Sequence, residues 1–216
     1  MSKRYVVTIT REFGSMGRPI AKRTAELLGI EYYDRDIVEE TAKRMNMPLS
    51  SVSREEERAK RQFFGMKYPL GMGTTDVQDN IFIAQQKIIN QLVERDSCIV
   101  VGRCSDYILK NMENAIHVYI YASYENKMKN CVELLGMKEK EAIKMIHDVD
   151  KARAQYHRHY AGYAMDDPKY KDLMIKSDLL GVEGTSELLV DIVKRKFISD
   201  FEEKSNTPMQ AYGASS

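Results

Sequence analysis

Hydrophobic positions along the chain fall into short β-branched runs that alternate with segments of helical character. The runs predict five buried strands, at residues 5–10, 31–33, 98–101, 116–121 and 173–176. Helical patterns follow at residues 20–28, 36–45, 50–62, 76–95, 123–135 and 185–201. Gly29 is expected to end the first helix and Ser123 to cap the fifth.

This alternation predicts an α/β protein of three layers, αβα, with a five-stranded parallel sheet in the middle. We expect a single domain over residues 1–202, with two inserted arms at about residues 46–75 and 138–165. Residues 138–160 are mostly polar and charged, so this second arm is expected to project from the core. The tail, residues 203–216, is expected to be disordered.

The overall charge narrows the classes of ligand. The 33 basic and 32 acidic side chains nearly cancel, so nothing in the bulk charge favours nucleic acid or an anionic membrane as a partner. No uncharged stretch approaches the ~20 apolar residues that cross a bilayer, and no signal-peptide pattern is present. Cys98, Cys104 and Cys131 lack the spacing of a zinc site or disulfide framework. We therefore expect a cytoplasmic protein whose positive charge for any anionic ligand is local.

The turn between the first strand and the first helix, REFGSMGRP at residues 11–19, contains candidate chemistry. Gly14 and Gly17 permit positive φ and a close backbone approach, so that successive N–H groups can converge on an anion. The following helix directs its positive N-terminus at the same place. Arg18 adds a local charge, and Pro19 suits the first turn of a helix. An ordinary tight turn is the alternative.

Measured against the pattern G-x-x-x-x-G-K-[ST], this turn departs at three positions. Glu12 stands at the first glycine, Arg18 replaces the lysine, and Pro19 replaces the hydroxyl residue that binds Mg²⁺. The motif alone therefore predicts no more than an anion site.

Polar residues also follow two later strands. Asp34, Arg35 and Asp36 come after residues 31–33, where either aspartate could simply cap the next helix and the arginine could be solvated. Arg103 follows the strand at residues 98–101 behind a glycine. The next residue, Cys104, has no histidine near it in sequence to lower its pKa, which favours a packing role.

The second arm carries a basic run interleaved with aromatic residues. Such a run is typical of a solvated helix face. The alternative is a lid whose cations cover a migrating phosphoryl group, with Arg153 as the best candidate. The run comprises Asp150, Lys151, Arg153, Tyr156, His157, Arg158 and His159.

Five sequence blocks occur in the same order as in a known family and cover about residues 3–200. They resemble the cytidylate kinase-like family, a divergent branch of the P-loop nucleoside monophosphate kinases. The blocks are TITREFGSMGRPIAKRTAELLGIEYYDRDIV, IVVGRCSDYIL, HVYIYAS, DKARAQYHRHY and YKDLMIKSDLLGVEGTSELLVDIV. The resemblance implies a P-loop kinase fold with helical lid and acceptor arms, and ATP-dependent phosphoryl transfer to a nucleoside monophosphate or similar small acceptor.

By resemblance, three groups of residues would form the site, and Arg18 and Arg153 would be its catalytic members. The ATP phosphates would lie on Gly14, Ser15, Met16, Gly17, Arg18 and Pro19, the acceptor on Asp34, Arg35, Asp36 and Arg103, and the lid would comprise Asp150, Lys151, Arg153 and Tyr156. Mg²⁺ is implied without its usual protein ligand, which Ser15, a water or the carboxylate of Asp34 or Asp36 could replace.

Two departures from the family pattern leave another function open. Pro19 removes the usual metal ligand, and Cys104 stands where cytidylate kinases have an aspartate that contacts the acceptor. A non-catalytic nucleotide-binding or regulatory protein that keeps the kinase fold is therefore the alternative. A homodimer is compatible with the polar arms.

Overall fold

The computed structural model describes residues 4–34, 37, 39, 40, 43 and 76–198. Arg35, Asp36, the first arm (46–75), the expected helix at 50–62 and the tail lie outside the described residues, as does most of the expected helix at 36–45. The described elements are β1 (Val6–Arg11), α1 (Gly17–Leu28), β2 (Glu31–Tyr33), α4 (Asp76–Arg95), β3 (Cys98–Val101), α5 (Ser105–Ile108), β4 (Ala115–Tyr121), α6 (Tyr124–Lys129), η1 (Asn130–Leu134), α7 (Glu139–Ala161), η2 (Pro168–Tyr170), β5 (Leu173–Lys176) and α8 (Gly181–Phe197).

The five strands form one parallel sheet, as the sequence predicts, and the structure gives their order as β2-β3-β1-β4-β5. In the central strand, Val6 lies opposite Cys98 of β3 and Ala115 of β4. Because β1 has a neighbour on each side and a helical layer on each face, its first five residues are all buried.

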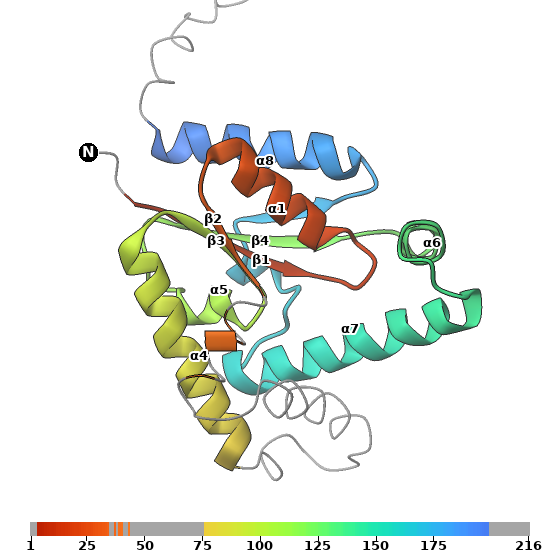
Figure 1. Cartoon of the computed structure of the whole chain (residues 1–216), viewed down its shortest axis with the longest axis horizontal. Helices are drawn as coiled ribbons and strands as arrows, with labels where there is room; N and C mark the ends of the chain where they lie inside the picture. Colours follow the sequence, from red (N-terminus) through yellow and green to blue (C-terminus); the bar gives the residue numbers. More distant parts are fainter. Residues whose placement is uncertain (1–3, 35–36, 38, 41–42, 44–75, 199–216) are drawn as a thin grey trace, which may run out of the picture.

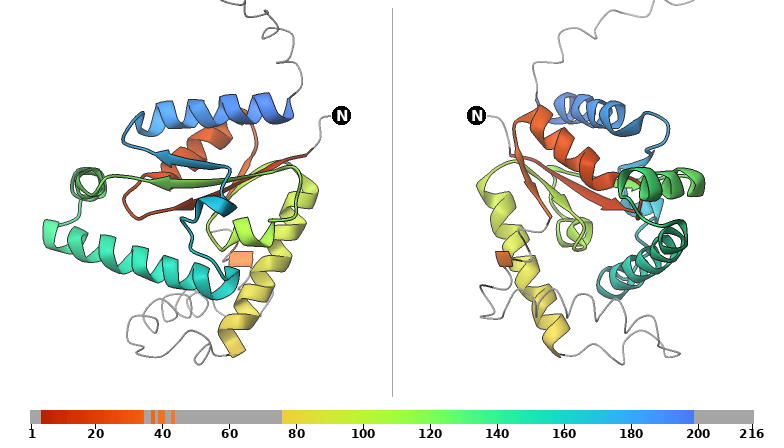
Figure 2. Two further views of the ribbon diagram at one scale, coloured as in Figure 1. Left: turned by 180° about the vertical axis from the view of Figure 1, so that it is seen from behind. Right: turned by 45° about the vertical axis from the view of Figure 1, so that its right-hand side comes forward.

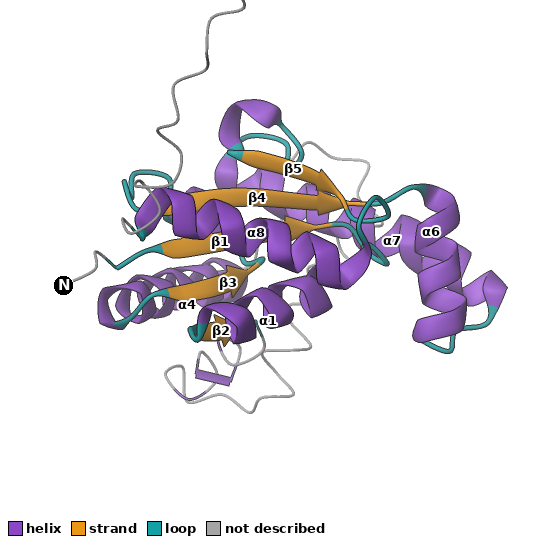
Figure 3. Cartoon of the chain, turned by 90° about the horizontal axis from the view of Figure 1, so that it is seen from above, coloured by secondary structure: helices purple, strands orange, loops and turns teal. Residues whose placement is uncertain are grey.

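Helices cover both faces of the sheet, which confirms the three-layer fold. Helices α1 and α8 lie on one face, and α4 and α5 on the other (Figure 1; Figure 3). Alternate residues of β1 supply the two cores: Val7 and Ile9 pack with the α1 and α8 layer, and Val6 packs with Ile88 and Ile89 of α4. Among the described helices, none is long and apolar enough to span a membrane.

Most element boundaries follow the sequence prediction closely. Gly29 ends α1 with φ 65°, and its N–H bonds to carbonyls of the last helical turn. Ser123 caps α6 by accepting a hydrogen bond from the Asn126 amide at 3.4 Å. The predicted start of the last helix was wrong by one turn, because α8 begins at Gly181, whose φ of 66° lets the chain turn directly into the helix.

The second arm is mainly the long helix α7, which runs alongside the sheet on the side away from α1 and α8 (Figure 2). It packs against α6 and η1, where Ala142 and Ile146 form a small core with Cys131. Ala152 and His157 are also buried. Neither core of the sheet contains a described residue of α7, which agrees with the expectation that this segment projects from the core. The small apolar side of a mostly charged helix is enough to attach it.

Candidate functional site

The site lies at the carboxyl ends of β1 and β3, two neighbouring strands of the sheet. From β1 the chain passes to β2 and β3 on one side, and from β3 it crosses to β4 and β5 on the other. In open α/β sheets, ligands bind where the strand order reverses in this way. The turns that follow β1 and β3 are therefore the expected walls of a ligand site.

The turn after β1 directs its carbonyl groups toward donors of the protein. Gly14 and Met16 both have positive φ, 75° and 60°, which curls the backbone. The hydroxyl of Ser15 donates to the Glu12 carbonyl at 2.9 Å, and the side-chain amide of Asn130 donates to the Gly14 carbonyl at 2.8 Å. Together with the Met16 carbonyl, which accepts from the Ile20 amide at 3.0 Å, three carbonyls of this turn are thus satisfied within the protein.

The amide groups of the same turn are left available. None of the hydrogen bonds among the described residues uses the backbone N–H of Ser15, Met16 or Gly17. These N–H groups precede or begin α1, whose N-terminus carries partial positive charge. Satisfied carbonyls beside free amides are the arrangement that binds an anion.

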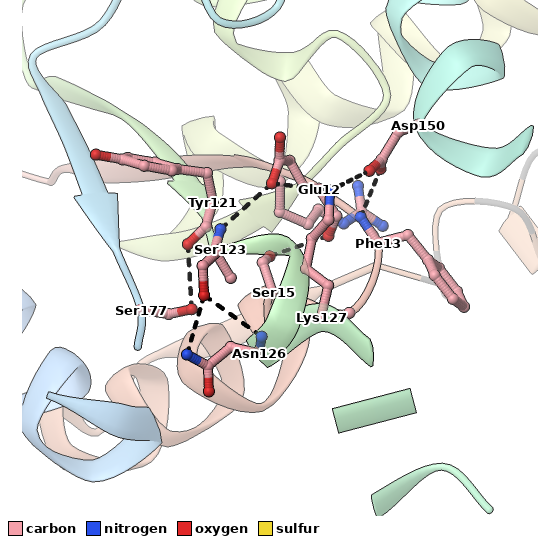
Figure 4. Close-up of polar contacts among 12 residues, drawn as sticks. Glu12, Phe13, Ser15, Tyr121, Ser123, Asn126, Lys127, Asp150 and Ser177 are labelled. Atoms are coloured by element: carbon pink, nitrogen blue, oxygen red, sulfur yellow. Dashed lines mark hydrogen bonds and ion pairs between the residues drawn. The ribbon is translucent and has the colours of Figure 1, made fainter. Parts of the chain in front are cut away.

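A buried junction joins α6 and α7 to this turn. The Lys127 ammonium lies 3.2 Å from the Glu12 carboxylate and 2.8 Å from that of Asp150, and Asp150 also accepts a hydrogen bond from the Phe13 amide at 2.6 Å (Figure 4). Burial lowers the pKa of Lys127, but the hydrogen bonds and charges of the two carboxylates outweigh it and raise the pKa. The junction fixes α7 against the turn.

Beyond the junction, a pocket of about 110 Å³ is rich in positive charge. We call it the arginine pocket: the guanidinium groups of Arg11, Arg18, Arg103 and Arg153 together with the Asp34 carboxylate. Tyr156, His157, Cys104 and Met165 line its less polar part. Four arginines are among the described residues that line it, so the pocket is suited to an anionic ligand.

The Asp34 carboxylate interacts with two of these arginines. Its Oδ2 lies 2.5 Å from Arg18 Nε, and its Oδ1 lies 3.7 Å from Arg11 Nη2. Arg18 is half exposed, whereas Asp34 is buried. Oδ1 of Asp34 has no hydrogen-bond partner among the described residues.

The other arginines of the pocket, Arg11, Arg103 and Arg153, are partly buried and line the same cavity. Arg153 Nη1 donates to the backbone carbonyl of Arg11 at 3.3 Å. Burial lowers the pKa of Arg153 to about 10, with Asp150 opposing this shift and Arg18 adding to it. Asp150 thus stabilises the charge of Arg153 while it also takes part in the junction described above.

The side chain of Arg11 lines the pocket and passes close to the backbone of two glycines, in space that a Cβ on either glycine would occupy. A Cβ on Gly17 would lie 2.7 Å from Arg11 Cβ, and a Cβ on Gly102 would lie 2.2 Å from Arg11 Nη1. Gly17 is therefore required for space, since its φ is not positive. Sequence reasoning missed Arg11. The available signal was a charged residue placed directly after a buried strand.

The turn after β3 holds Arg103 in an unusual backbone conformation. Gly102, Arg103 and Cys104 have consecutive positive φ values of 74°, 57° and 52°. Left-handed non-glycine residues cost of order 1–2 kcal/mol each. Cys104 is buried, and burial raises the pKa of its thiol well above the usual value, in agreement with a packing role.

Next to this turn lies a second charged group, which we call the Asp106 cluster: Asp106, His157, Tyr163 and Lys171. The Asp106 carboxylate accepts a hydrogen bond from the buried Lys171 ammonium and lies 2.9 Å from His157 Nε2. The Tyr163 hydroxyl donates to it at 3.3 Å. Burial opposes ionisation of Asp106, but His157 and Lys171 outweigh burial and lower its pKa below the usual range. The cluster joins α5, the end of α7 and the segment before β5.

The structure brings together most residues that the sequence singled out. Arg18, Asp34, Arg103, Arg153 and Tyr156 meet at the pocket. The turn from Gly14 to Pro19 borders it, with Pro19 exposed in the first turn of α1. Asp150 faces the turn, whereas Lys151 is exposed on α7. Arg35 and Asp36 lie outside the described residues.

A divalent cation would find few protein ligands here. Within the described ranges, no group of three or more histidine, cysteine, aspartate or glutamate side chains is arranged to hold a metal. The Ser15 hydroxyl, one of the expected substitutes, is buried and bonded to the Glu12 carbonyl. Oδ1 of Asp34 is the remaining described candidate. One carboxylate fits Mg²⁺ when phosphate oxygens and waters complete the shell.

Comparisons with known proteins agree with this geometry. The model of the cytidylate kinase-like family matches residues 6–179. A crystal structure of an uncharacterized protein from Eubacterium ventriosum ATCC 27560 is 26% identical, with a TM-score of 0.66 and coverage of 88% of this chain and 99% of that one. No curated protein was found to match the sequence.

Two solved shikimate kinases share the fold at lower identity. Shikimate kinase from Acinetobacter baumannii, in complex with shikimate, is 13% identical, with a TM-score of 0.51 and coverage of 90% of this chain and 96% of that one. The enzyme from Bacteroides thetaiotaomicron is 10% identical, with a TM-score of 0.52 and coverage of 88% and 98%.

Proposed function

The chain belongs to the cytidylate kinase-like family, and from this premise we propose that it transfers the γ-phosphoryl group of ATP to a nucleoside monophosphate or a similar small acceptor. The observation that carries the proposal is the pairing of the free amides of Ser15, Met16 and Gly17 with the arginine pocket beside them. Phosphoryl transfer is catalysed almost entirely by positioning and by charge. Both requirements are met by groups that this chain holds in place.

On the donor side, the turn Gly14–Pro19 and Arg18 would hold the β- and γ-phosphates of ATP. A guanidinium can bind two oxygens at once, which suits Arg18 to the position where other kinases have lysine. Asp34, through its unbonded Oδ1, would be one ligand of Mg²⁺. The metal, when bound, would neutralise charge that develops on the phosphates.

On the acceptor side, Arg103 and Asp34 would bind the molecule that receives the phosphoryl group, with Arg35 and Asp36 as further proposed ligands. Helix α7 would act as a lid. Asp150 attaches it to the phosphate turn, Arg153 faces the pocket and would neutralise the migrating group, and Tyr156 lines the wall beside it. Lys151, exposed on the same helix, would add to the charge outside the pocket.

One observation favours a second function, nucleotide binding without catalysis. Pro19 has no hydroxyl, and the Ser15 hydroxyl is turned inward to the Glu12 carbonyl. The protein therefore offers Mg²⁺ no hydroxyl ligand at the place where P-loop enzymes supply one. A regulatory protein that binds ATP in the same pocket would need none.

The experiment that separates the two functions combines an ADP-release assay with calorimetric titration of ATP. The acceptor panel comprises the nucleoside monophosphates and shikimate, which a protein of the same fold binds. Arg158→Ala is the matched control for Arg153→Ala, because Arg158 is an exposed arginine of the same helix. Acceptor-dependent ADP release that needs Arg153 supports transfer. ATP binding without turnover supports the regulatory function, and absence of ATP binding contradicts both.

A further inference from the structure

Arg11 is largely buried, and the contacts of its side chain among the described residues do not account for its burial. Its side chain is 12% exposed, and its nearest carboxylate, Asp34, is 3.7 Å away. Its Nε has no hydrogen-bond partner among the described residues. A guanidinium has five N–H donors, and a buried one normally satisfies them with several acceptors. The contacts that are present fall far short of that.

The surroundings of Arg11 make its charge unfavourable in the unliganded protein. Burial and the nearby charge of Arg153 lower the pKa of Arg11 well below its usual value, and Asp34 offsets only part of this. An arginine remains protonated in proteins, so the shift expresses an energetic cost of holding the charge there. Two glycines, Gly17 and Gly102, leave the channel that this side chain occupies. The chain thus accommodates a costly cation at a fixed place.

We propose that Arg11 contacts the ligand directly and, with Arg103 and Arg153, binds an oxyanion group that carries at least two negative charges. This inference rests on the proposed function for the identity of that group, a phosphoryl group. The oxyanion supplies the acceptors that Arg11 lacks and cancels the repulsion among the three cations. Planar guanidinium groups bind tetrahedral oxyanions through paired N–H bonds, which makes three of them a selective site for a phosphoryl group.

The proposal gives Arg11 and Arg18 different roles. Arg18 is half exposed and is held by Asp34 at 2.5 Å, so it already has a strong partner without a ligand. Among the described residues, the acidic partner of Arg11 is the same carboxylate at the longer distance of 3.7 Å. The residue that stands at the lysine position of the motif is therefore the more satisfied of the two. Arg11, which lies outside that motif, is the one whose donors need an anion.

The test is a calorimetric titration of inorganic pyrophosphate, at fixed ionic strength, into the full chain and three variants. Arg11→Met keeps an unbranched side chain that fits the glycine channel, and Arg11→Lys keeps the charge. The matched control is Arg23→Met, because Arg23 is a partly exposed arginine of α1 that pairs with Glu183. Thermal melting of each variant without ligand accompanies the titration.

We expect Arg11→Met to weaken pyrophosphate binding by about 10- to 100-fold, the usual effect of losing a charge-assisted contact. Arg11→Lys should recover part of the affinity, and Arg23→Met should stay within about twofold of wild type. The unliganded Arg11→Met protein should melt no lower than wild type, because a costly charge has been removed. Unchanged pyrophosphate affinity in Arg11→Met, or a protein that melts far lower or fails to fold, would overturn the proposal.

Failure of this inference can be told apart from failure of the proposed function. Pyrophosphate binding requires neither a nucleotide nor turnover. Binding that depends on Arg11, in a protein that releases no ADP with any acceptor, contradicts phosphoryl transfer and leaves the inference standing. ADP release that is undiminished in Arg11→Met contradicts the inference about Arg11 and leaves phosphoryl transfer standing.

Discussion

The Asp106 cluster and the arginine pocket are neighbouring groups of charged side chains that share His157 at their border. They differ in how many hydrogen-bond and ion-pair partners their charges find within the protein. In the Asp106 cluster, one carboxylate is held by Lys171, His157 and the Tyr163 hydroxyl. In the arginine pocket, the Asp34 carboxylate contacts Arg18 at 2.5 Å and Arg11 at 3.7 Å, and Arg11 Nε has no hydrogen-bond partner among the described residues. The first group has its partners within the chain. The second, within the part of the chain that the structure describes, leaves a buried nitrogen of Arg11 without an acceptor.

The difference indicates which group is structural and which is functional. A satisfied buried network fixes neighbouring elements, and here it lies beside the left-handed turn that carries Arg103. An excess of buried cations destabilises the empty protein and is retained where a ligand completes it. The Asp106 cluster would therefore hold the scaffold while the arginine pocket binds the ligand. Substitution of one residue in either group tests that group's role separately from the other's.

The largest effect is expected from Asp106→Asn. Removing this carboxylate leaves the Lys171 ammonium buried without its counter-ion, so we expect the free energy of unfolding to fall by about 3–5 kcal/mol. Urea denaturation measures the change. The control is Asp191→Asn, which breaks an exposed pair with Arg195 and should cost under about 0.5 kcal/mol. Equal losses in the two variants would mean that the cluster has no special structural role.

The next effect concerns catalysis. We expect Arg153→Ala to lower turnover by roughly 10²-fold, because this arginine would act on charge that is largest in the transition state. ATP affinity should stay within about threefold of wild type. Single-turnover kinetics and calorimetry measure the two quantities, with Arg158→Ala as the control on the same helix. Full turnover in Arg153→Ala would place this residue with the structural group.

A smaller effect is expected from acid. The folded-state pKa of Asp106 is lowered, so its contribution to stability is present above the unfolded-state value of about 3.9 and is lost as the pH falls toward the folded-state value. Near pH 3, the advantage of wild type over Asp106→Asn should have shrunk by roughly 1 kcal/mol. Denaturation of both proteins at pH 7 and pH 3 checks this. A constant difference would show that Asp106 has no shifted pKa.

The smallest effect separates anion binding from metal binding. Asp34→Asn removes the pocket's carboxylate, so pyrophosphate should bind about 3- to 10-fold more tightly without Mg²⁺. Glu183→Gln, which removes an exposed carboxylate bound to Arg23, should leave the affinity unchanged. Calorimetry in the presence of a chelator gives both values. Weaker pyrophosphate binding in Asp34→Asn would show that Asp34 orients the arginines more than it competes with the ligand.

Local patterns predicted the fold and part of the site. The five strands were visible as β-branched runs, and the glycine turn stood out between the first run and the first helix. Asp34 and Arg103 lie just after strands and Arg18 lies at the start of the helix after β1, and they meet in space because parallel strands end at one edge of the sheet. Local sequence patterns were therefore sufficient for residues whose place in the site follows from the order of strands and helices alone.

Features that depend on long-range packing could not be predicted in this way. The Asp106 cluster joins residues that are up to 65 positions apart, as with Asp106 and Lys171. The attachment of α7 depends on Asp150 reaching the Phe13 amide across 137 positions. The sequence placed Arg11 at the start of the glycine turn, after the strand expected at residues 5–10, and assigned it no role. Its importance emerged only from the two glycines that make room for it.

The most direct test of the central claim, that the unsatisfied pocket is the phosphate site, is a crystal structure with Mg²⁺ and a non-hydrolysable ATP analogue. The account predicts that the γ-phosphate accepts hydrogen bonds from the amides of Ser15, Met16 and Gly17 and from the guanidinium group of Arg11. The Asp106 cluster should keep its contacts unchanged. A triphosphate bound elsewhere, with those amides bonded within the protein, would contradict the account.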